Sequence, residues 1–344
     1  MKRILIVKVT ALGDIIQAQP IVADLHRAFP GVEIDWAADE LFADVARWNP
    51  GIRHVHSAPL KQFKKTRSMA ALGDIASSIG ALRRDRYDVI CDIQGVYKSA
   101  IISWIARGKR RFGYLNQDLG ERGAAFAYSR RFEPRPPGTT VQSMRTTVAR
   151  ALGYTVEETP SFGLRIPGAE AIELHDDRPM AILFHGTSKD DKKWPHAQWV
   201  VCAQQLVSRG MNVVLPWGSD KEQQAAQAVV AEVPGATMLP RLSVLEMAQY
   251  TARAALVVGT DTGFTHLAYA LERPTVLVLT ATTQDTIGIS YPGRAVTVGD
   301  AGKSPSTQAV LDAIESVWPA PAAEQQGLRA EPSSPARPAH YAHG

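Results

Sequence analysis

Residues 3–14 read RILIVKVTALGD, a short β-branched apolar run that gives way to a glycine and an acid. Such a run is typical of a strand that is buried on both faces of a sheet. Gly13 permits a tight turn, and Asp14 stands where a helix is expected to begin. The stretch therefore predicts the first strand, turn and helix of a parallel α/β domain.

The same alternation of apolar runs and helix-length segments fills most of the chain, and it restarts once. The first series predicts strands at 3–9, 32–37, 53–56 and 87–93 and helices at 14–29, 68–84, 96–107, 121–128 and 141–152. The second series follows a stretch with proline and glycine. It predicts strands at 180–185, 212–216, 237–239, 255–259 and 274–279. It predicts helices at 196–209, 221–232, 243–253 and 263–271. Two such series predict two doubly wound, Rossmann-like α/β domains that face one another.

The length of 344 residues exceeds what one hydrophobic core usually serves, which also favours two domains. We expect an N-terminal domain over residues 1–160, a linker over 161–178 and a C-terminal domain over 179–318. Residues 319–344 are rich in Ala, Pro, Gln and Ser and are expected to form a disordered tail.

Charge and cysteine content narrow the class of protein. Residues 1–158 carry a net charge of +8 and residues 159–344 a net charge of −4, which indicates an anionic partner for the first half unless the asymmetry is chance. Cys91 and Cys202 lie far apart, so neither a disulfide framework nor a zinc site is expected, and a reducing compartment fits. Lys8 interrupts the N-terminal apolar run too early for a signal peptide, and no run is long enough to span a membrane.

Three absent motifs exclude common functions. Neither first strand is followed by Gly-x-Gly-x-x-Gly, which argues against a nicotinamide or flavin enzyme, and there is no Walker A sequence. No Asp-x-Asp pair occurs, which disfavours a transferase that holds Mg²⁺ on such a pair. We therefore expect no metal and no cofactor, and a leaving diphosphate would depend on lysine, hydroxyls and helix dipoles.

Candidate site residues follow the strands, because ligands of parallel sheets bind at the carboxyl ends of strands. In the first domain Asp14 is either a partner of free helix-start N–H groups or a general base at the cleft between the domains. Lys8 is either a solvated edge residue or an inward-facing contact for an anion.

In the second domain three strand ends carry polar loops that converge at one sheet edge. The first holds Thr187 and Ser188 with Lys192 before a helix, and the second places Glu222 just inside a helix start, where it could accept from ribose hydroxyls. The third, residues 259–266, has two glycines, an acid and hydroxyls at a helix start, which is the strongest phosphate-site signal in the chain. His266, on the first turn of an apolar helix, is by itself more often a packed residue.

These ordered motifs resemble those of the lipopolysaccharide heptosyltransferases of glycosyltransferase family 9. The likeness covers about residues 2–317 and rests on Lys8 with Gly13-Asp14, on residues 187–195, on residues 215–218 with Glu222, and on residues 261–266. It implies the GT-B fold and inverting, metal-independent transfer of L-glycero-D-manno-heptose from ADP-heptose to the first Kdo of Kdo₂-lipid A. The alternatives within the family are a sibling that adds the second heptose or another core sugar. The alternatives from other classes are a non-catalytic nucleotide-sugar or glycolipid binding protein and a sugar-nucleotide epimerase on the same fold.

Position by position, the resemblance implies roles for individual residues. Asp14 would be the general base, Lys192 with Thr187 and Ser188 would hold the diphosphate, and Glu222 the ribose. Leu242 would lie against adenine, and the heptose and phosphates would be surrounded by Asp261, Thr262, Gly263 and His266. Two departures weaken the acceptor assignment: Thr139 and Ser143 replace a histidine and an arginine, and residues 280–285 replace a Gly-Pro-Thr-Asp-Pro turn.

The basic first half has a reason in this interpretation, because Kdo₂-lipid A carries carboxylates and phosphates. The candidate acceptor contacts are cations of that half, namely Lys61, Lys64, Lys65, Arg67, Lys98, Arg122 and Arg145. Such cations also attract an anionic membrane surface. The implied location is the cytoplasm, in peripheral contact with the inner membrane, with no nucleic-acid partner.

Overall fold

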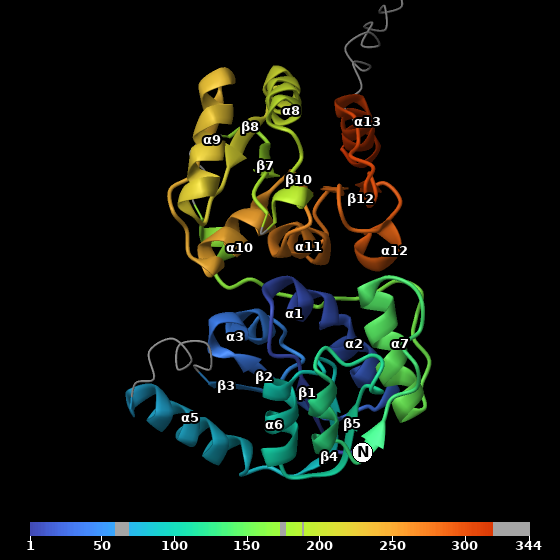
Figure 1. Ribbon diagram of the computed structural model, residues 1–344. Coiled ribbons are helices and arrows are strands. Elements are labelled where there is room, and N and C mark those ends of the chain that lie inside the picture. The colour runs from blue at the N-terminus through green and yellow to red at the C-terminus, as the bar shows by residue number, and fades with distance from the viewer. Residues whose placement is uncertain (59–68, 173–176, 188, 319–344) are drawn as a thin grey trace, which may run out of the picture.

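Two parallel six-stranded sheets form the framework of the chain, as the sequence predicts (Figure 1). The computed structural model describes residues 1–58, 69–172, 177–187 and 189–318. The first sheet has the order β3-β2-β1-β4-β5-β6 and the second the order β12-β11-β10-β7-β8-β9. Read from opposite ends, the two orders are the same doubly wound topology.

The first sheet and its helices come from the N-terminal part of the chain. Its strands are β1 (Arg3–Val7), β2 (Glu33–Asp39), β3 (His54–Ala58), β4 (Tyr87–Asp92), β5 (Gly108–Gly113) and β6 (Arg130–Arg131). Its helices are α1 (Leu12–Ala18), α2 (Pro20–Ala28), α3 (Glu40–Arg47), α5 (Met69–Leu82), α6 (Tyr97–Ile105), the 3₁₀ helix η1 (Arg122–Ala127) and α7 (Thr140–Leu152). A short 3₁₀ turn, η2 (Ala169–Ala171), follows before the second sheet begins.

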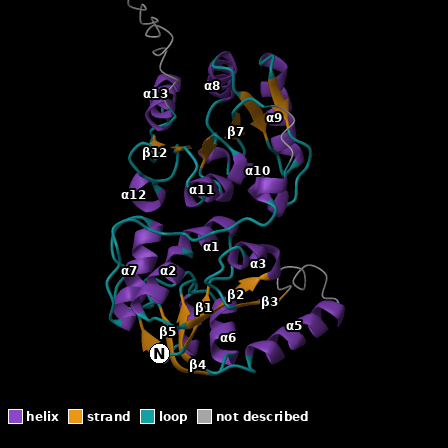
Figure 2. Cartoon of the chain, turned by 180° about the vertical axis from the view of Figure 1, so that it is seen from behind, coloured by secondary structure: helices purple, strands orange, loops and turns teal. Residues whose placement is uncertain are grey.

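The second sheet restarts the same alternation. Its strands are β7 (Met180–Phe184), β8 (Asn212–Leu215), β9 (Ala236–Met238), β10 (Leu256–Thr260), β11 (Thr275–Val278) and β12 (Ala295–Val298). Its helices are η3 (Asp190–Lys192), α8 (His196–Ser208), α9 (Asp220–Glu232), α10 (Val244–Arg253), α11 (Gly263–Ala270), α12 (Gln284–Ile287) and α13 (Thr307–Val317). The described chain ends just after α13, on the outer side of this domain (Figure 2).

Both faces of each sheet are buried, which explains why the strands are apolar throughout. On β1, Ile4 and Ile6 enter the core shared with α1, α2, α3 and α7, whereas Leu5 and Val7 enter the core under α5 and α6. In the second sheet α8, α9 and α13 cover one face and α10 and α11 the other. Within the described part of the chain, no helix is both long and apolar enough to cross a bilayer.

The helix predicted over residues 14–29 is corrected to two helices. Helix α1 ends at Ala18, and α2 begins with Pro20 as its first residue. Proline has no N–H for a preceding turn but fits the start of a new helix, so the chain bends at Gln19. The break gives α1 its own direction, and α1 packs against α11 of the other domain.

Candidate active site

The two domains touch where α1 and α11 begin, and glycines on both sides permit the contact. A Cβ atom added to Gly13 would lie 3.3 Å from the Cα of Gly263, and one added to Gly263 would lie 2.6 Å from Cδ2 of Leu12. The backbones approach this closely because neither residue has a side chain. Asp14 directly follows Gly13, the residue that contacts the start of α11.

Asp14 sits in the first turn of α1 with its side chain 43% exposed. Its Oδ2 accepts a hydrogen bond of 3.1 Å from the N–H of Ala11, and its Oδ1 lies 3.8 Å from Nζ of Lys8. The carboxylate thus satisfies the helix start, as the structural interpretation of the sequence expects. The same position leaves it accessible to a bound molecule between the domains.

Lys8 faces inward and is buried, so the solvated-edge interpretation is wrong. Burial lowers the pKa of its ammonium, while the nearby carboxylate of Asp14 acts in the opposite direction. A buried cation beside Asp14 supplies positive potential to the first-domain side of the contact. It can stabilise negative charge there without being solvated itself.

A polar cluster around Asp261 forms the second-domain side. Lys192 Nζ lies 2.5 Å from Asp261 Oδ2, and His266 Nε2 lies 3.2 Å from Oδ1. Burial raises the pKa of Asp261, but the hydrogen bonds and charges of His266 and Lys192 outweigh this and hold it at about 2. Asp261 is therefore a permanent anion, and in this state it neutralises Lys192.

The start of α11 completes this cluster. Thr262 caps the helix, and its Oγ1 accepts a hydrogen bond of 3.4 Å from the N–H of Thr265. Gly263 is the first helical residue, so the free N–H groups of this turn are not covered by a side chain. His266 is buried on the same turn, 3.9 Å from where a Cβ of Gly13 would lie. This arrangement suits a phosphate or another anion.

Two hydroxyls from the segment that departs from the family pattern also reach the cluster. The Oγ1 of Thr282 donates to Asp261 Oδ2 at 3.3 Å, and the Oγ1 of Thr280 donates to the carbonyl of Asp191 at 2.8 Å. Sequence reasoning missed both contacts. The run of three threonines among residues 280–283 is the signal that could have indicated them.

The remaining predicted donor residues lie at neighbouring strand ends. Thr187 Oγ1 is buried and has no hydrogen-bond partner among the described residues. Glu222 Oε2 accepts hydrogen bonds from the N–H groups of Gly218 and Ser219 at 2.7 and 3.1 Å. One of its two oxygens therefore caps the start of α9. Leu242, in the segment that joins β9 to α10, is half-buried and packs on the core under α10 and α11. Ser188 falls outside the described residues.

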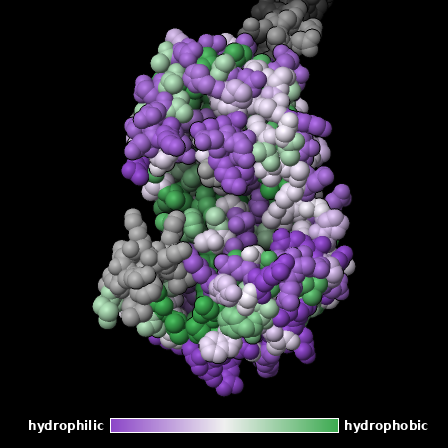
Figure 3. All heavy atoms as spheres, viewed as in Figure 1, coloured by the Kyte–Doolittle hydropathy of each residue, from purple (hydrophilic) through white to green (hydrophobic). Residues whose placement is uncertain are grey.

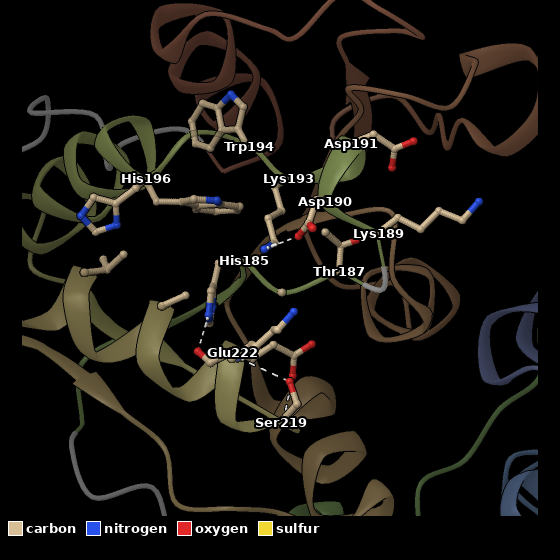
Figure 4. Close-up of a pocket in the computed structure, with 15 residues that line it drawn as sticks. His185, Thr187, Lys189, Asp190, Asp191, Lys193, Trp194, His196, Ser219 and Glu222 are labelled. Carbon is tan, nitrogen blue, oxygen red and sulfur yellow. Dashed lines mark hydrogen bonds and ion pairs between the residues drawn. The ribbon is translucent and has the colours of Figure 1, made fainter.

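A pocket of about 650 Å³ opens between the loop after β7 and helices α8 and α9 (Figure 4). Thr187 and Glu222 line it, together with His185 and Trp194 of the predicted loop, which were given no role of their own, and Trp199, which sequence reasoning missed. Lys192, Leu242 and the residues of α11 do not line it. The predicted donor residues are therefore distributed on both flanks of the 185–193 loop.

The predicted acceptor cations divide into three groups. Lys98 and Arg122 are exposed on the N-terminal domain. The prediction that Arg145 contacts the acceptor is wrong, because its side chain is buried. Its guanidinium donates to Asp24 through Nε at 2.7 Å and through Nη2 at 2.9 Å. A buried, fully paired arginine holds α7 to α2 and is unavailable to a surface ligand. Lys61, Lys64, Lys65 and Arg67 lie outside the described residues.

Two doubly wound domains of one topology meet at loops that bear a carboxylate and a helix start suited to an anion, an arrangement that fits a two-domain nucleotide-sugar glycosyltransferase. The model of glycosyltransferase family 9 (heptosyltransferase) matches residues 75–312, and the chain belongs to this family. It is 34% identical over 279 residues to lipopolysaccharide heptosyltransferase 1 of Pseudomonas aeruginosa, covering 80% of this chain and 77% of the relative.

Solved structures agree with this assignment. The Escherichia coli heptosyltransferase WaaC with ADP superimposes with a TM-score of 0.80 at 28% identity, covering 91% of this chain and 99% of that one. The same E. coli enzyme with ADP-2-deoxy-2-fluoro heptose gives a TM-score of 0.75 at 27% identity, with the same coverage. The predicted fold class, enzyme class and family are thus confirmed.

Proposed function

We propose that this enzyme transfers L-glycero-D-manno-heptose from ADP-heptose to the first Kdo of Kdo₂-lipid A in lipopolysaccharide core synthesis. The donor is supported by the related E. coli structures with ADP and with an ADP-heptose analogue, and the reaction by the P. aeruginosa relative. The observation that supports the mechanism is the close approach of Gly13, the residue before Asp14, to Gly263 at the start of α11.

In the proposed donor complex the diphosphate replaces Asp261 as the partner of Lys192 and accepts hydrogen bonds from the start of α11 and from Thr187. The unpartnered hydroxyl of Thr187 and the open turn at Gly263 support this assignment. The remaining Glu222 oxygen takes the ribose, and Leu242 packs on adenine. Asp261, Thr262, Gly263 and His266 surround the heptose and the phosphates, with Ser188 beside them. These groups stabilise the leaving diphosphate without a metal or cofactor.

Asp14 acts as the general base in this proposal. The acceptor hydroxyl oxygen attacks the anomeric carbon on the face opposite ADP, its proton passes to the Asp14 carboxylate, and the ADP oxygen leaves with the bonding electron pair. Attack from the opposite face inverts the anomeric centre. The buried ammonium of Lys8, 3.8 Å from the Asp14 carboxylate, favours the approach of an anionic acceptor.

Anionic groups of the acceptor are bound by cations of the first domain, including Lys98 and Arg122 and, by sequence, the Lys61–Arg67 group. The net charge of +8 over residues 1–158 supports this assignment. We place the enzyme in the cytoplasm, in peripheral contact with the inner membrane, with no nucleic-acid partner. This location fits an acceptor that is held in a bilayer by its acyl chains.

The Asp14→Asn variant tests the mechanism. Turnover of ADP-heptose and Kdo₂-lipid A should fall about 10²- to 10⁴-fold, the usual contribution of a general base. ADP-heptose binding by calorimetry should stay near wild type, because Asn keeps the shape of the side chain. Asp44→Asn, at an exposed acid of the same domain, is the matched control and should retain full activity. Near-normal turnover by Asp14→Asn would reject this base.

Mass spectrometry of the product then identifies the acceptor. The proposal expects one added heptose on Kdo₂-lipid A. Product formed only from an acceptor that already carries a heptose would instead identify a sibling transferase of the same family.

A further inference from the structure

One side of the N-terminal domain carries a row of large apolar side chains in solvent. Tyr97, Ile101 and Trp104 on α6 are 50%, 46% and 62% exposed. Their spacing of four and then three residues places them on one face of the helix. Phe126 of η1, which packs beside α6, is 56% exposed. We call these four residues the α6 apolar row. A continuous row of this kind marks a contact surface, unlike single scattered apolar residues.

An apolar groove runs beside this row, between α5 and α6. The groove has a volume of about 160 Å³. Its floor is formed by alanines of β2 and β3, namely Ala37, Ala38 and Ala58. Its walls are formed by Ile75, Ile79 and Leu82 of α5 and by Ile101, Ile102 and Ile105 of α6. Figure 3 shows hydrophobic side chains gathered over this part of the lower domain. The apolar surface is thus a hollowed band rather than a flat patch.

Cations border the band. Lys98 lines the groove, and Arg83 and Arg107 join the ends of α5 and α6, where Nη1 of Arg83 donates to the carbonyl of Ile105 at 3.3 Å. Arg122 begins η1. The acids on this side include Asp74 on α5, Glu40, which lines a hollow next to the groove with Asp74, and Glu121, which accepts a hydrogen bond from the N–H of Tyr97. Cations therefore outnumber acids among these described residues.

We propose that this face, the α6 apolar row with its groove and bordering cations, docks on an anionic lipid bilayer. Tyr and Trp are the side chains that favour the boundary between acyl chains and headgroups, and Lys and Arg attract anionic lipids. The row begins five residues after β4 ends, so it runs from the carboxyl edge of the sheet, where Asp14 lies, along the side of the domain. A bilayer on this side brings a lipid-anchored sugar to the cleft. The assignment rests on the proposed function and identifies the surface by which the enzyme meets its acceptor.

Flotation of the full-length protein with vesicles tests the proposal. The wild type should float with vesicles of phosphatidylcholine and phosphatidylglycerol and much less with phosphatidylcholine alone. The double variant Ile101→Asp, Trp104→Asp should bind at least tenfold more weakly. Its matched control, Val201→Asp, Leu245→Asp, changes two exposed apolar helix residues of the other domain and should bind as wild type. Circular dichroism checks that both variants are folded.

Two further readouts separate the alternatives. With a water-soluble, deacylated acceptor the Ile101→Asp, Trp104→Asp enzyme should keep wild-type turnover, whereas turnover of acceptor embedded in vesicles should fall. If neither protein transfers heptose, the proposed function fails while the flotation result still stands. Equal flotation of the variant and wild type overturns the docking surface. A wild-type dimer that the variant abolishes, without a change in flotation, would identify a second copy as the occupant and also overturn it.

Discussion

At the scale of single residues, the proposed donor site depends on the pairing of Lys192 with Asp261. Without donor, the Lys192 ammonium is paired with a carboxylate whose pKa is held at about 2. A diphosphate brings more negative charge than one carboxylate, so it can replace Asp261 as the partner of the lysine. The ion pair holds the half-buried Lys192 ammonium beside Asp261.

Lys192→Met should therefore weaken ADP binding about 10- to 100-fold, because one charge-assisted hydrogen bond to the diphosphate is lost. Titration calorimetry measures the loss directly. Lys303→Met removes an exposed cation of the same domain and serves as the control. Equal ADP affinity in both variants would show that Lys192 does not bind the phosphates.

Residue types at strand ends could be predicted from sequence, but the partners of those residues could not. The polar loop at residues 259–266 was found because glycines and hydroxyls before an apolar helix have a local meaning. Arg145 was assigned to the acceptor because its charge is visible in the sequence, whereas its partner Asp24 lies 121 residues away. Long-range pairing of this kind leaves no local pattern.

At the scale of elements, the close approach of α1 and α11 depends on Gly263. Gly263→Ala would place a Cβ 2.6 Å from Leu12 Cδ2 and 3.1 Å from the Gly13 nitrogen, so the two helix starts must separate by several tenths of an ångström. A shift of the proposed base relative to the proposed anion site should lower kcat about tenfold or more. The melting temperature should change little, because the cores of the two domains are untouched.

Steady-state kinetics and thermal melting of Gly263→Ala test this expectation, with Gly80→Ala on α5 as the control, where an added Cβ meets nothing within 4 Å. Adding Leu12→Ala relieves the shorter contact and should recover part of the activity. Unchanged kcat in Gly263→Ala would mean that the contact does not set the catalytic geometry.

Strands with a continuous apolar run were predicted well, whereas strands in which charged or half-buried residues interrupt that run were missed. Strand β5 carries Lys109, Arg110 and Arg111, which hide its single buried aromatic, Phe112. Strand β12 has one buried residue, Ala295, and three half-buried ones, so it lacks the apolar run of a central strand. Helices α3 and α13 were not assigned although Asp39 and Ser306 cap them. Cap residues before an amphipathic segment were the available signal.

For the whole molecule, two doubly wound domains follow from two series of buried strands, but their docking does not. The domains are joined by Phe162 against Tyr269, with ring centroids 5.5 Å apart, and by the hydroxyl of Thr140 donating to the carbonyl of Thr286 at 2.9 Å. These contacts pair residues more than 100 positions apart. Which residues meet across the two domains depends on the folded surfaces of both, and no periodic pattern in the sequence predicts those surfaces.

Each domain also contains a paired acid with a lowered pKa, from which we expect a loss of stability at low pH. In the first, Asp35 is fully buried and binds Arg53 Nε at 2.9 Å and the hydroxyl of Tyr87 at 2.8 Å. Burial alone would raise the pKa of Asp35, but its hydrogen bonds to His56, Arg53 and Tyr87 lower it from 3.8 to about 2. Asp261 has the same value in the second domain.

The folded-state pKa of Asp35 thus lies below the unfolded one, so its stabilisation is complete above about pH 4 and disappears as the pH falls toward 2. The shift corresponds to about 2 kcal/mol of unfolding free energy. Asp35→Asn should be clearly less stable than wild type at pH 7 in urea unfolding, and the difference should shrink between about pH 4 and pH 2. The exposed Glu158→Gln is the control. A difference that stays constant from pH 7 to pH 2 would show that this carboxylate is not responsible for the acid response.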